Sequence, residues 1–202
     1  MQQLFNDMIK QDVKPFLSKR GFAKKSLTFS KTTEGLIYLF NFQKSSGNSA
    51  DHVMFYVNCG IYAAELAQIQ SKEISTAPQE VECHFRARIG EIARAVPDRF
   101  AITPDTNMDD LRITLLNGLE EVIHFYDTMT SARSIVDYYT SGPFLHLGEE
   151  CFHLLLQSHD EAAAKQYLKA LREKYGTEKR WTIFETKYKA IFNTYGVEFD
   201  EL

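Results

Sequence analysis

The sequence predicts an α+β fold in which an N-terminal helix and an antiparallel sheet of four or five strands precede a helical C-terminal half. Three observations lead to this prediction. A helix ends at a glycine near residue 21, residues 27–62 carry strand patterns, and apolar residues recur at helical spacing after residue 105. The first half should therefore supply the sheet, and the second half should supply most of the helices.

The first helix is expected to end at Gly21. Lys19 and Arg20 precede this glycine, and basic residues favour the carbonyl end of a helix. Glycine adopts the left-handed conformation that commonly terminates a helix. A strand should follow, because residues 27–32 alternate between apolar and polar types.

A β-hairpin and a third strand are expected next. Residues 33–35 (Thr-Glu-Gly) form a short turn, and residues 36–44 return as a strand that is apolar on both sides at its start, which is typical of a central strand. In residues 53–62 successive side chains should alternate across the sheet. The apolar alternate positions of this run predict its core face: Val53, Phe55, Val57, Cys59 and Ile61.

Residues 83–89 are expected to form a fourth strand, and residues 100–103 a short extended piece. Alternation places Cys83 and Phe85 on one side of the fourth strand, with Ala87 and Ile89. The opposite side carries His84, Arg86 and Arg88.

The remaining segments are expected to be helical. Thr106 occupies an N-cap position for a helix that reaches about Thr128. Four further helices are predicted over residues 132–139, 145–157, 158–175 (with Ser158 in a capping box) and 178–195. No low-complexity linker separates the halves, so we expect a single compact domain over residues 1–202, with helix and sheet in 1–104 and a helical extension packed on them in 105–202.

Several short motifs in the first half occur in a fixed order. They are Lys-Pro-Phe-Leu at 14–17, Gly-Phe at 21–22 followed by lysines, Thr-Phe at 28–29, Asn-Phe-Gln-Lys-Ser at 41–45 and Arg-Ala-Arg-Ile-Gly at 86–90. In this ordered set the chain resembles the uncharacterised family known as domain of unknown function 4304, over about its first half. The resemblance implies an α+β domain with a helix on an antiparallel sheet. It implies no catalytic residues, because none are agreed for the family.

Composition and charge narrow the classes of partner and location. The net charge is −4 and the pI is about 5.9, which disfavours nucleic acid as the main partner. No run approaches the length of a membrane span, and the N-terminal residues carry an acid early, so we expect no membrane association and a cytoplasmic location. Three distant cysteines without a Cys-x-x-Cys pair, Cys59, Cys83 and Cys151, predict reduced, buried thiols.

A polar face of the sheet is the strongest candidate for a ligand site. Guanidinium groups present paired donors to carboxylates and phosphates, and neighbouring amides can complete the contacts. The candidate ligand-binding residues are Asn41, Gln43, Tyr56, Asn58, His84, Arg86 and Arg88. The alternative is an ordinary solvated sheet face, or arginines paired with helix carboxylates.

We expect no catalytic residues, no metal site and no cofactor. His146 and Glu150, and likewise Glu149 and His153, have the i,i+4 spacing of helical metal ligands. However, the two histidines are seven residues apart, about 10 Å along a helix, so both cannot easily reach one ion. No nucleophile elbow, nucleotide-binding loop or zinc-protease motif occurs in the sequence.

These observations favour a non-catalytic cytosolic binding protein, for example one that neutralises a protein partner such as a toxin. The alternative from another class is an enzyme or sensor that acts on a small anion at the face of Arg86 and Arg88. A third hypothesis is a self-associating structural protein, and the oligomeric state is left open.

Overall fold

The computed structural model describes residues 1–199, which form two compact units. The first unit comprises residues 1–63 and 75–130, and the second comprises residues 64–74 and the chain from residue 131 onward. The two units therefore do not coincide with the two halves of the sequence. One short helix of the N-terminal half belongs to the second unit, and the long helix that begins at Met108 belongs to the first unit.

The chain opens with a helical segment that ends at the predicted glycine. Its parts are α1 (Gln2–Met8), the π-helical turn η1 (Ile9–Val13) and α2 (Lys14–Ser18). Gly21 has φ +86°, a conformation that strains any residue with a Cβ, so the glycine allows the chain to leave the helix and enter the sheet.

The sheet is antiparallel throughout, as predicted. Its strands are β1 (Ala23–Lys25), β2 (Thr28–Thr32), β3 (Leu36–Lys44), β4 (Val53–Ala63), β5 (Phe85–Arg88) and β6 (Arg99–Ile102). They pair in the order β1-β2-β3-β4-β5, and β6 pairs with the other end of β4. The α+β fold class is confirmed, and the sixth strand is the three-residue β1, which is too short to show an alternating pattern.

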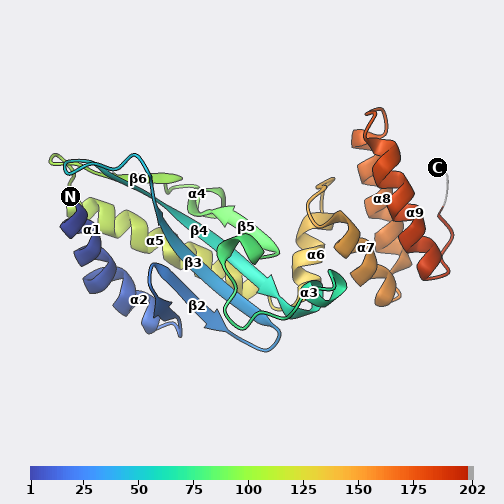
Figure 1. Cartoon of the computed structure of the whole chain (residues 1–202), viewed down its shortest axis with the longest axis horizontal. Coiled ribbons are helices and arrows are strands. Elements are labelled where there is room, and N and C mark those ends of the chain that lie inside the picture. The colour runs from blue at the N-terminus through green and yellow to red at the C-terminus, as the bar shows by residue number, and fades with distance from the viewer. Residues whose placement is uncertain (200–202) are drawn as a thin grey trace. The chain divides into compact units, whose positions relative to one another are not determined.

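One face of the sheet is covered by helices. α5 (Met108–Thr128) runs along the sheet (Figure 1), and Tyr126 of this helix packs against Phe40 with ring centroids 5.3 Å apart. Phe5 of α1 contacts Phe55 of β4 on the same face at 5.0 Å. The predicted core face of β4 is confirmed, because all five of its residues are buried.

The chain before β5 departs from the predicted strand. Residues 80–82 form a 3-10 turn, η2 (Glu80–Glu82), so regular alternation begins only at Phe85. A Cβ added to Gly60 would lie 2.8 Å from the Sγ of Cys83, so the Cys83 side chain covers Gly60. Phe85 instead packs on Phe125 of α5, so placing Cys83 on the same side as Phe85 was wrong.

A short helix follows β5, and the N-cap of α5 differs from the predicted one. α4 (Ile89–Ile92) leads toward β6. The side chain of Asn107 caps α5 by accepting hydrogen bonds from the backbone N–H groups of Asp109 and Asp110. The Thr106 hydroxyl accepts the Thr103 N–H at 2.8 Å and therefore closes the preceding turn instead.

The second unit is helical. It contains α3 (Ala64–Ile69), α6 (Ala132–Thr140), α7 (Gly148–Gln157), α8 (Glu161–Tyr175) and α9 (Trp181–Thr194). Phe152 of α7 is fully buried among the rings of Tyr167, Tyr188 and Phe192, at centroid distances of 5.0, 4.6 and 5.4 Å. An aromatic cluster thus joins α7, α8 and α9. Within residues 1–199, no helix combines the length and apolar character needed to cross a membrane.

Candidate functional site

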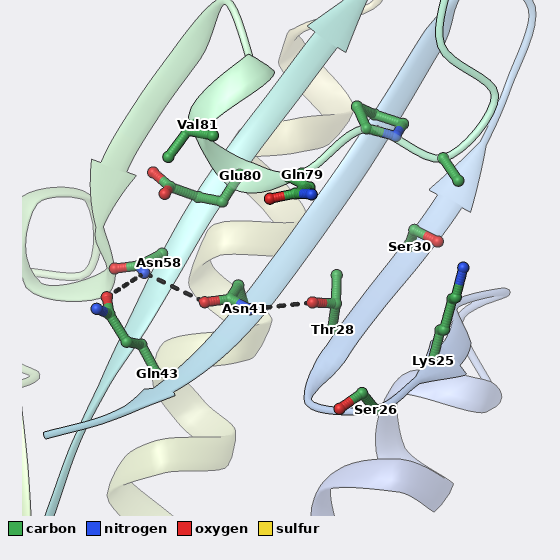
Figure 2. Close-up of a pocket in the computed structure, with 12 residues that line it drawn as sticks. Lys25, Ser26, Thr28, Ser30, Asn41, Gln43, Asn58, Gln79, Glu80 and Val81 are labelled. Atoms are coloured by element: carbon green, nitrogen blue, oxygen red, sulfur yellow. Dashed lines mark hydrogen bonds between the residues drawn. The ribbon is translucent and has the colours of Figure 1, made fainter. Parts of the chain in front are cut away.

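A pocket of about 560 Å³ lies on the face of the sheet opposite α5 (Figure 2). Its floor is made by polar side chains of β2, β3 and β4, which project from the sheet toward the viewer in Figure 2. Residues 77–81 form one wall, and Lys25 and Ser26 lie on the opposite side. We call this hollow the sheet pocket, and it lies wholly within the first unit.

The strand register builds a polar row across the sheet beneath the pocket. Directly paired positions on neighbouring strands point to the same face. The paired residues, in order from β1 to β5, are Lys25, Thr28, Asn41, Asn58 and Arg88. Four hydrogen-bonding side chains and one ammonium group are therefore aligned by backbone pairing alone.

Hydrogen bonds connect this row into what we call the amide network. Arg88 Nη1 donates to Asn58 Oδ1. Asn58 Nδ2 donates to Asn41 Oδ1 at 3.3 Å and to Gln43 Oε1 at 3.0 Å. Asn41 Nδ2 then donates to Thr28 Oγ1 at 3.0 Å. Figure 2 shows the contacts among the amides and the threonine as dashed lines.

Asn58 is the buried centre of the amide network. Its side chain is 5% exposed, although it is polar and lies on the open face of the sheet. A buried amide costs free energy unless its hydrogen-bonding groups are satisfied. Its carbonyl oxygen and both amide hydrogens are all engaged, so the network holds Asn58 in a single orientation.

Tyr56 and Arg88 support the network from the side. The Arg88 guanidinium lies over the Tyr56 ring, 4.4 Å from its centroid, which is a cation–π contact. Neither side chain lines the sheet pocket. No carboxylate among residues 1–199 forms a salt bridge with the Arg88 guanidinium, although Glu91 accepts the backbone N–H of Arg88 at 2.7 Å.

Arg86 and His84 lie outside the pocket lining. Arg86 Nε is 2.8 Å from Glu80 Oε1, so this arginine pairs with a carboxylate of the pocket wall. His84 is 3% exposed, and its Nδ1 accepts the Ala63 N–H at 3.1 Å. Its ring packs on Tyr62 at 5.2 Å. His84 thus holds the chain before β5 against the end of β4.

The structure therefore separates the seven predicted residues into two groups. Asn41, Gln43 and Asn58 line the sheet pocket. The other four do not line it: Tyr56, His84, Arg86 and Arg88. Alternation along a strand correctly indicated which side chains share a face, but it could not tell which of them a loop covers or a carboxylate engages.

Sequence reasoning missed part of the pocket lining. Thr28 and Ser30 could have been found, because counting back from the turn at Gly35 pairs Thr28 with Asn41 and Ser30 with Leu39. The wall at residues 77–81 carries no such signal, since its position depends on a loop that returns over the sheet.

The three cysteines are buried and chemically unreactive. Burial raises the pKa of Cys83 to about 12, and it also raises the pKa values of Cys59 and Cys151. All three are therefore neutral thiols at physiological pH, and free thiols in the structure.

Of the two predicted metal-ligand pairs, only Glu149 and His153 lie within one helix. His146 precedes α7, which begins at Gly148, and Glu149 pairs with Lys187 at 2.6 Å. Among residues 1–199 there is no group of three His, Cys, Asp or Glu side chains arranged to hold a metal ion.

Comparison with known proteins identifies a family but no activity. No curated protein and no solved structure matches the chain significantly. The profile of the family described as domain of unknown function (DUF4304) matches residues 13–128, which is more than half of the chain and includes the whole sheet and the sheet pocket. The chain therefore belongs to the DUF4304 family.

Proposed function

We propose that this protein is a non-catalytic binding protein and that the sheet pocket is its ligand site. The observation that carries the proposal is the amide network, which fixes several hydrogen-bonding groups in a pocket of about 560 Å³. This volume lies within the range of small-molecule sites, about 300–1,000 Å³. Preorganised polar groups reduce the entropy that is lost when a ligand binds.

The chemistry of the lining favours binding over catalysis. Its polar groups are mainly amides and hydroxyls, which stay neutral over the physiological pH range. Its one carboxylate, Glu80, is paired with Arg86, and its one ammonium group belongs to Lys25. General acid–base catalysis needs a group that exchanges a proton near neutral pH, and amides and hydroxyls do not supply one.

The experiment is a thermal-shift screen of small cytosolic metabolites with a matched pair of variants. Ser30→Tyr places a ring inside the pocket, whereas Thr32→Tyr places the same ring on the same strand and face but outside the pocket lining. A pocket ligand should raise the melting temperature of the parent and of the Thr32 variant, but not of the Ser30 variant. A ligand that stabilises all three proteins equally would contradict the proposed site. Consumption of a bound ligand, followed by mass spectrometry, would favour the enzyme hypothesis.

In its more specific form, the proposal is a cytosolic protein that neutralises a partner protein such as a toxin. The net charge of −4 supports this form, because an acidic protein attracts a basic partner. Such an association should weaken steeply as salt is added, and an affinity that is independent of salt would contradict the electrostatic argument.

A further inference from the structure

The hydrogen bonds of the amide network all run in one donor-to-acceptor direction, and the contact with Arg88 sets this direction. A guanidinium group carries only hydrogen-bond donors, so the Asn58 atom that it contacts must be the carbonyl oxygen. The side-chain nitrogen of Asn58 is thereby turned toward β3, where its two hydrogens reach Asn41 and Gln43. An amide that could otherwise flip is held in one orientation by a charged neighbour.

The orientation of the Asn58 amide in turn fixes the orientation of the side chains that face the pocket. Asn41 and Gln43 both use their oxygens to accept from Asn58, so each must present its amide nitrogen elsewhere. One hydrogen of Asn41 goes to Thr28, and the hydroxyl hydrogen of Thr28 must then point onward. Within residues 1–199, the second Asn41 hydrogen and both Gln43 side-chain hydrogens have no acceptor.

The pocket floor therefore displays donors to an incoming ligand. Lys25 adds an ammonium group beside Thr28, its direct partner across the strands. The charge of Glu80 on the opposite wall is offset by Arg86 at 2.8 Å. A ligand group with several acceptors and a negative charge would satisfy the hydrogen-bond donors of this surface. The lining contains one exposed cation, which matches a single negative charge on the ligand.

We propose that the sheet pocket binds the carboxylate of a small carboxylic acid, with the carboxylate oxygens on Asn41, Thr28 and Lys25, which follow one another on three neighbouring strands. This inference rests on the proposed function and specifies its ligand. The uncharged remainder of the acid packs toward Pro78 and Val81, two apolar residues of the wall at residues 77–81. An uncharged amide of the same shape offers one acceptor fewer and brings two donors toward a surface of donors.

The first test compares benzoate with benzamide, two probes of nearly equal shape. Benzoate should shift the two side-chain amide resonances of Asn41 in NMR titrations, and benzamide should bind about tenfold more weakly or worse, because a charge-assisted hydrogen bond is lost. Lys25→Met should weaken benzoate binding about tenfold. Its matched control is Lys24→Met, which removes the neighbouring ammonium group on the other face of β1 and should leave the dissociation constant unchanged.

The second test reverses the direction of the network with Asn58→Asp. The new carboxylate still accepts from Arg88, but it cannot donate, so Asn41 and Gln43 must turn their NH2 groups inward and their oxygens toward the pocket. Benzamide should then bind more tightly than it binds the parent, and benzoate less tightly. Charge repulsion alone would weaken benzoate and leave benzamide unchanged. That pattern would contradict the assigned direction.

The outcomes separate this inference from the proposed function. If benzamide or inorganic phosphate shifts the same resonances with an affinity equal to or higher than that of benzoate, the pocket is a binding site but the carboxylate assignment is wrong. If no probe shifts these resonances and the metabolite screen finds no ligand that Ser30→Tyr abolishes, both proposals are wrong.

Discussion

Single residues show that the two faces of the sheet are buried by different interactions. On the open face, Asn58 is buried only because Arg88, Asn41 and Gln43 satisfy its side chain. On the covered face, Phe55 is fully buried and needs no polar partner. The same strand thus stabilises the fold through apolar packing on one side and builds the candidate site on the other.

Phe55→Ala should lower the free energy of unfolding by about 3–5 kcal/mol, because truncating a buried ring leaves a cavity. The ring stacks on Phe100 at 5.1 Å and meets Phe5 at 5.0 Å, so neighbours from α1 and β6 would lose contact together. Urea denaturation measures the effect.

Met54→Ala is the matched control for this prediction. Met54 is the adjacent residue of β4, points to the opposite face and is only half-buried, so its truncation should cost less than about 1.5 kcal/mol. Equal losses from both variants would contradict the assigned core face.

At the scale of elements, the N-terminus of α8 combines a cap with an ion pair. Asp160 Oδ1 accepts the Ala163 N–H at 3.2 Å, and Asp160 Oδ2 lies 2.6 Å from Arg133 Nη2 of α6. The hydrogen bond from Arg133, and then the one from Ala163, lower the pKa of Asp160. One carboxylate therefore both caps α8 and links it to α6.

This carboxylate should make stability depend on pH in acid solution. A lowered folded-state pKa stabilises the protein above the unfolded pKa, about 3.9 for Asp, and the contribution is lost as pH falls through the folded value. Asp160→Asn keeps a capping oxygen but removes the charge. The parent should melt at a higher temperature than this variant at pH 7, and the gap should narrow below about pH 4. A gap that stays constant down to pH 3 would show that the ion pair contributes nothing.

α5 illustrates how an element can be tied to the sheet by one side chain. The Tyr126 hydroxyl donates to the Leu39 carbonyl at 2.7 Å and accepts the Gly60 N–H at 2.9 Å. Burial raises the pKa of Tyr126, which keeps the hydroxyl protonated and able to do both. The helix is thereby fixed over β3 and β4, beneath the strand positions that carry the amide network on the opposite face.

For the whole molecule, the state of the three cysteines is directly measurable. Cys59 and Cys83 belong to the first unit, Cys151 belongs to the second, and all three are buried thiols. Thiol titration of the unfolded, non-reduced protein should count three, whereas the native protein should react slowly because its thiols are buried and protonated. A count of one would reveal a disulfide and would overturn the prediction of a reducing compartment.

The predicted single compact domain stays a prediction, and the same thiols can test it. If the chain unfolds as one cooperative domain, Cys59 and Cys151 should become reactive at the same denaturant concentration. Mass spectrometry of labelled peptides distinguishes the two positions. Separate midpoints would contradict the prediction and would assign an unfolding step to each unit.

Much of the fold could be predicted because its signals are local. The glycine at residue 21, the hairpin turn at Gly35 and the alternation along β4 each depend on neighbouring residues, and each is found where it was expected. The predicted caps at Thr106 and Ser158 were wrong, because Asn107 and Asp160 cap these two helices. The placement of Cys83 was also wrong, because a 3-10 turn at residues 80–82 interrupts the expected strand spacing.

The candidate site was predictable only in part. Asn41, Gln43 and Asn58 were identified by strand alternation, and strand pairing brings them together. The salt bridge between Arg86 and Glu80 depends on where the loop before β5 lies over the sheet. No local sequence pattern specifies this position. Arg88 contacts the network from the neighbouring strand and does not line the pocket, because its guanidinium donates to the Asn58 carbonyl.

Local sequence patterns were enough to predict the fold class, the positions and faces of the main strands and the polar character of the open face. These follow from local conformational preference and from the two-residue period of a strand, which act without knowledge of distant residues. Local patterns did not specify which polar side chains line the pocket or which way their amides point. Those properties depend on contacts between residues 28, 41, 58 and 88, which are remote in sequence and meet only when the strands pair in register.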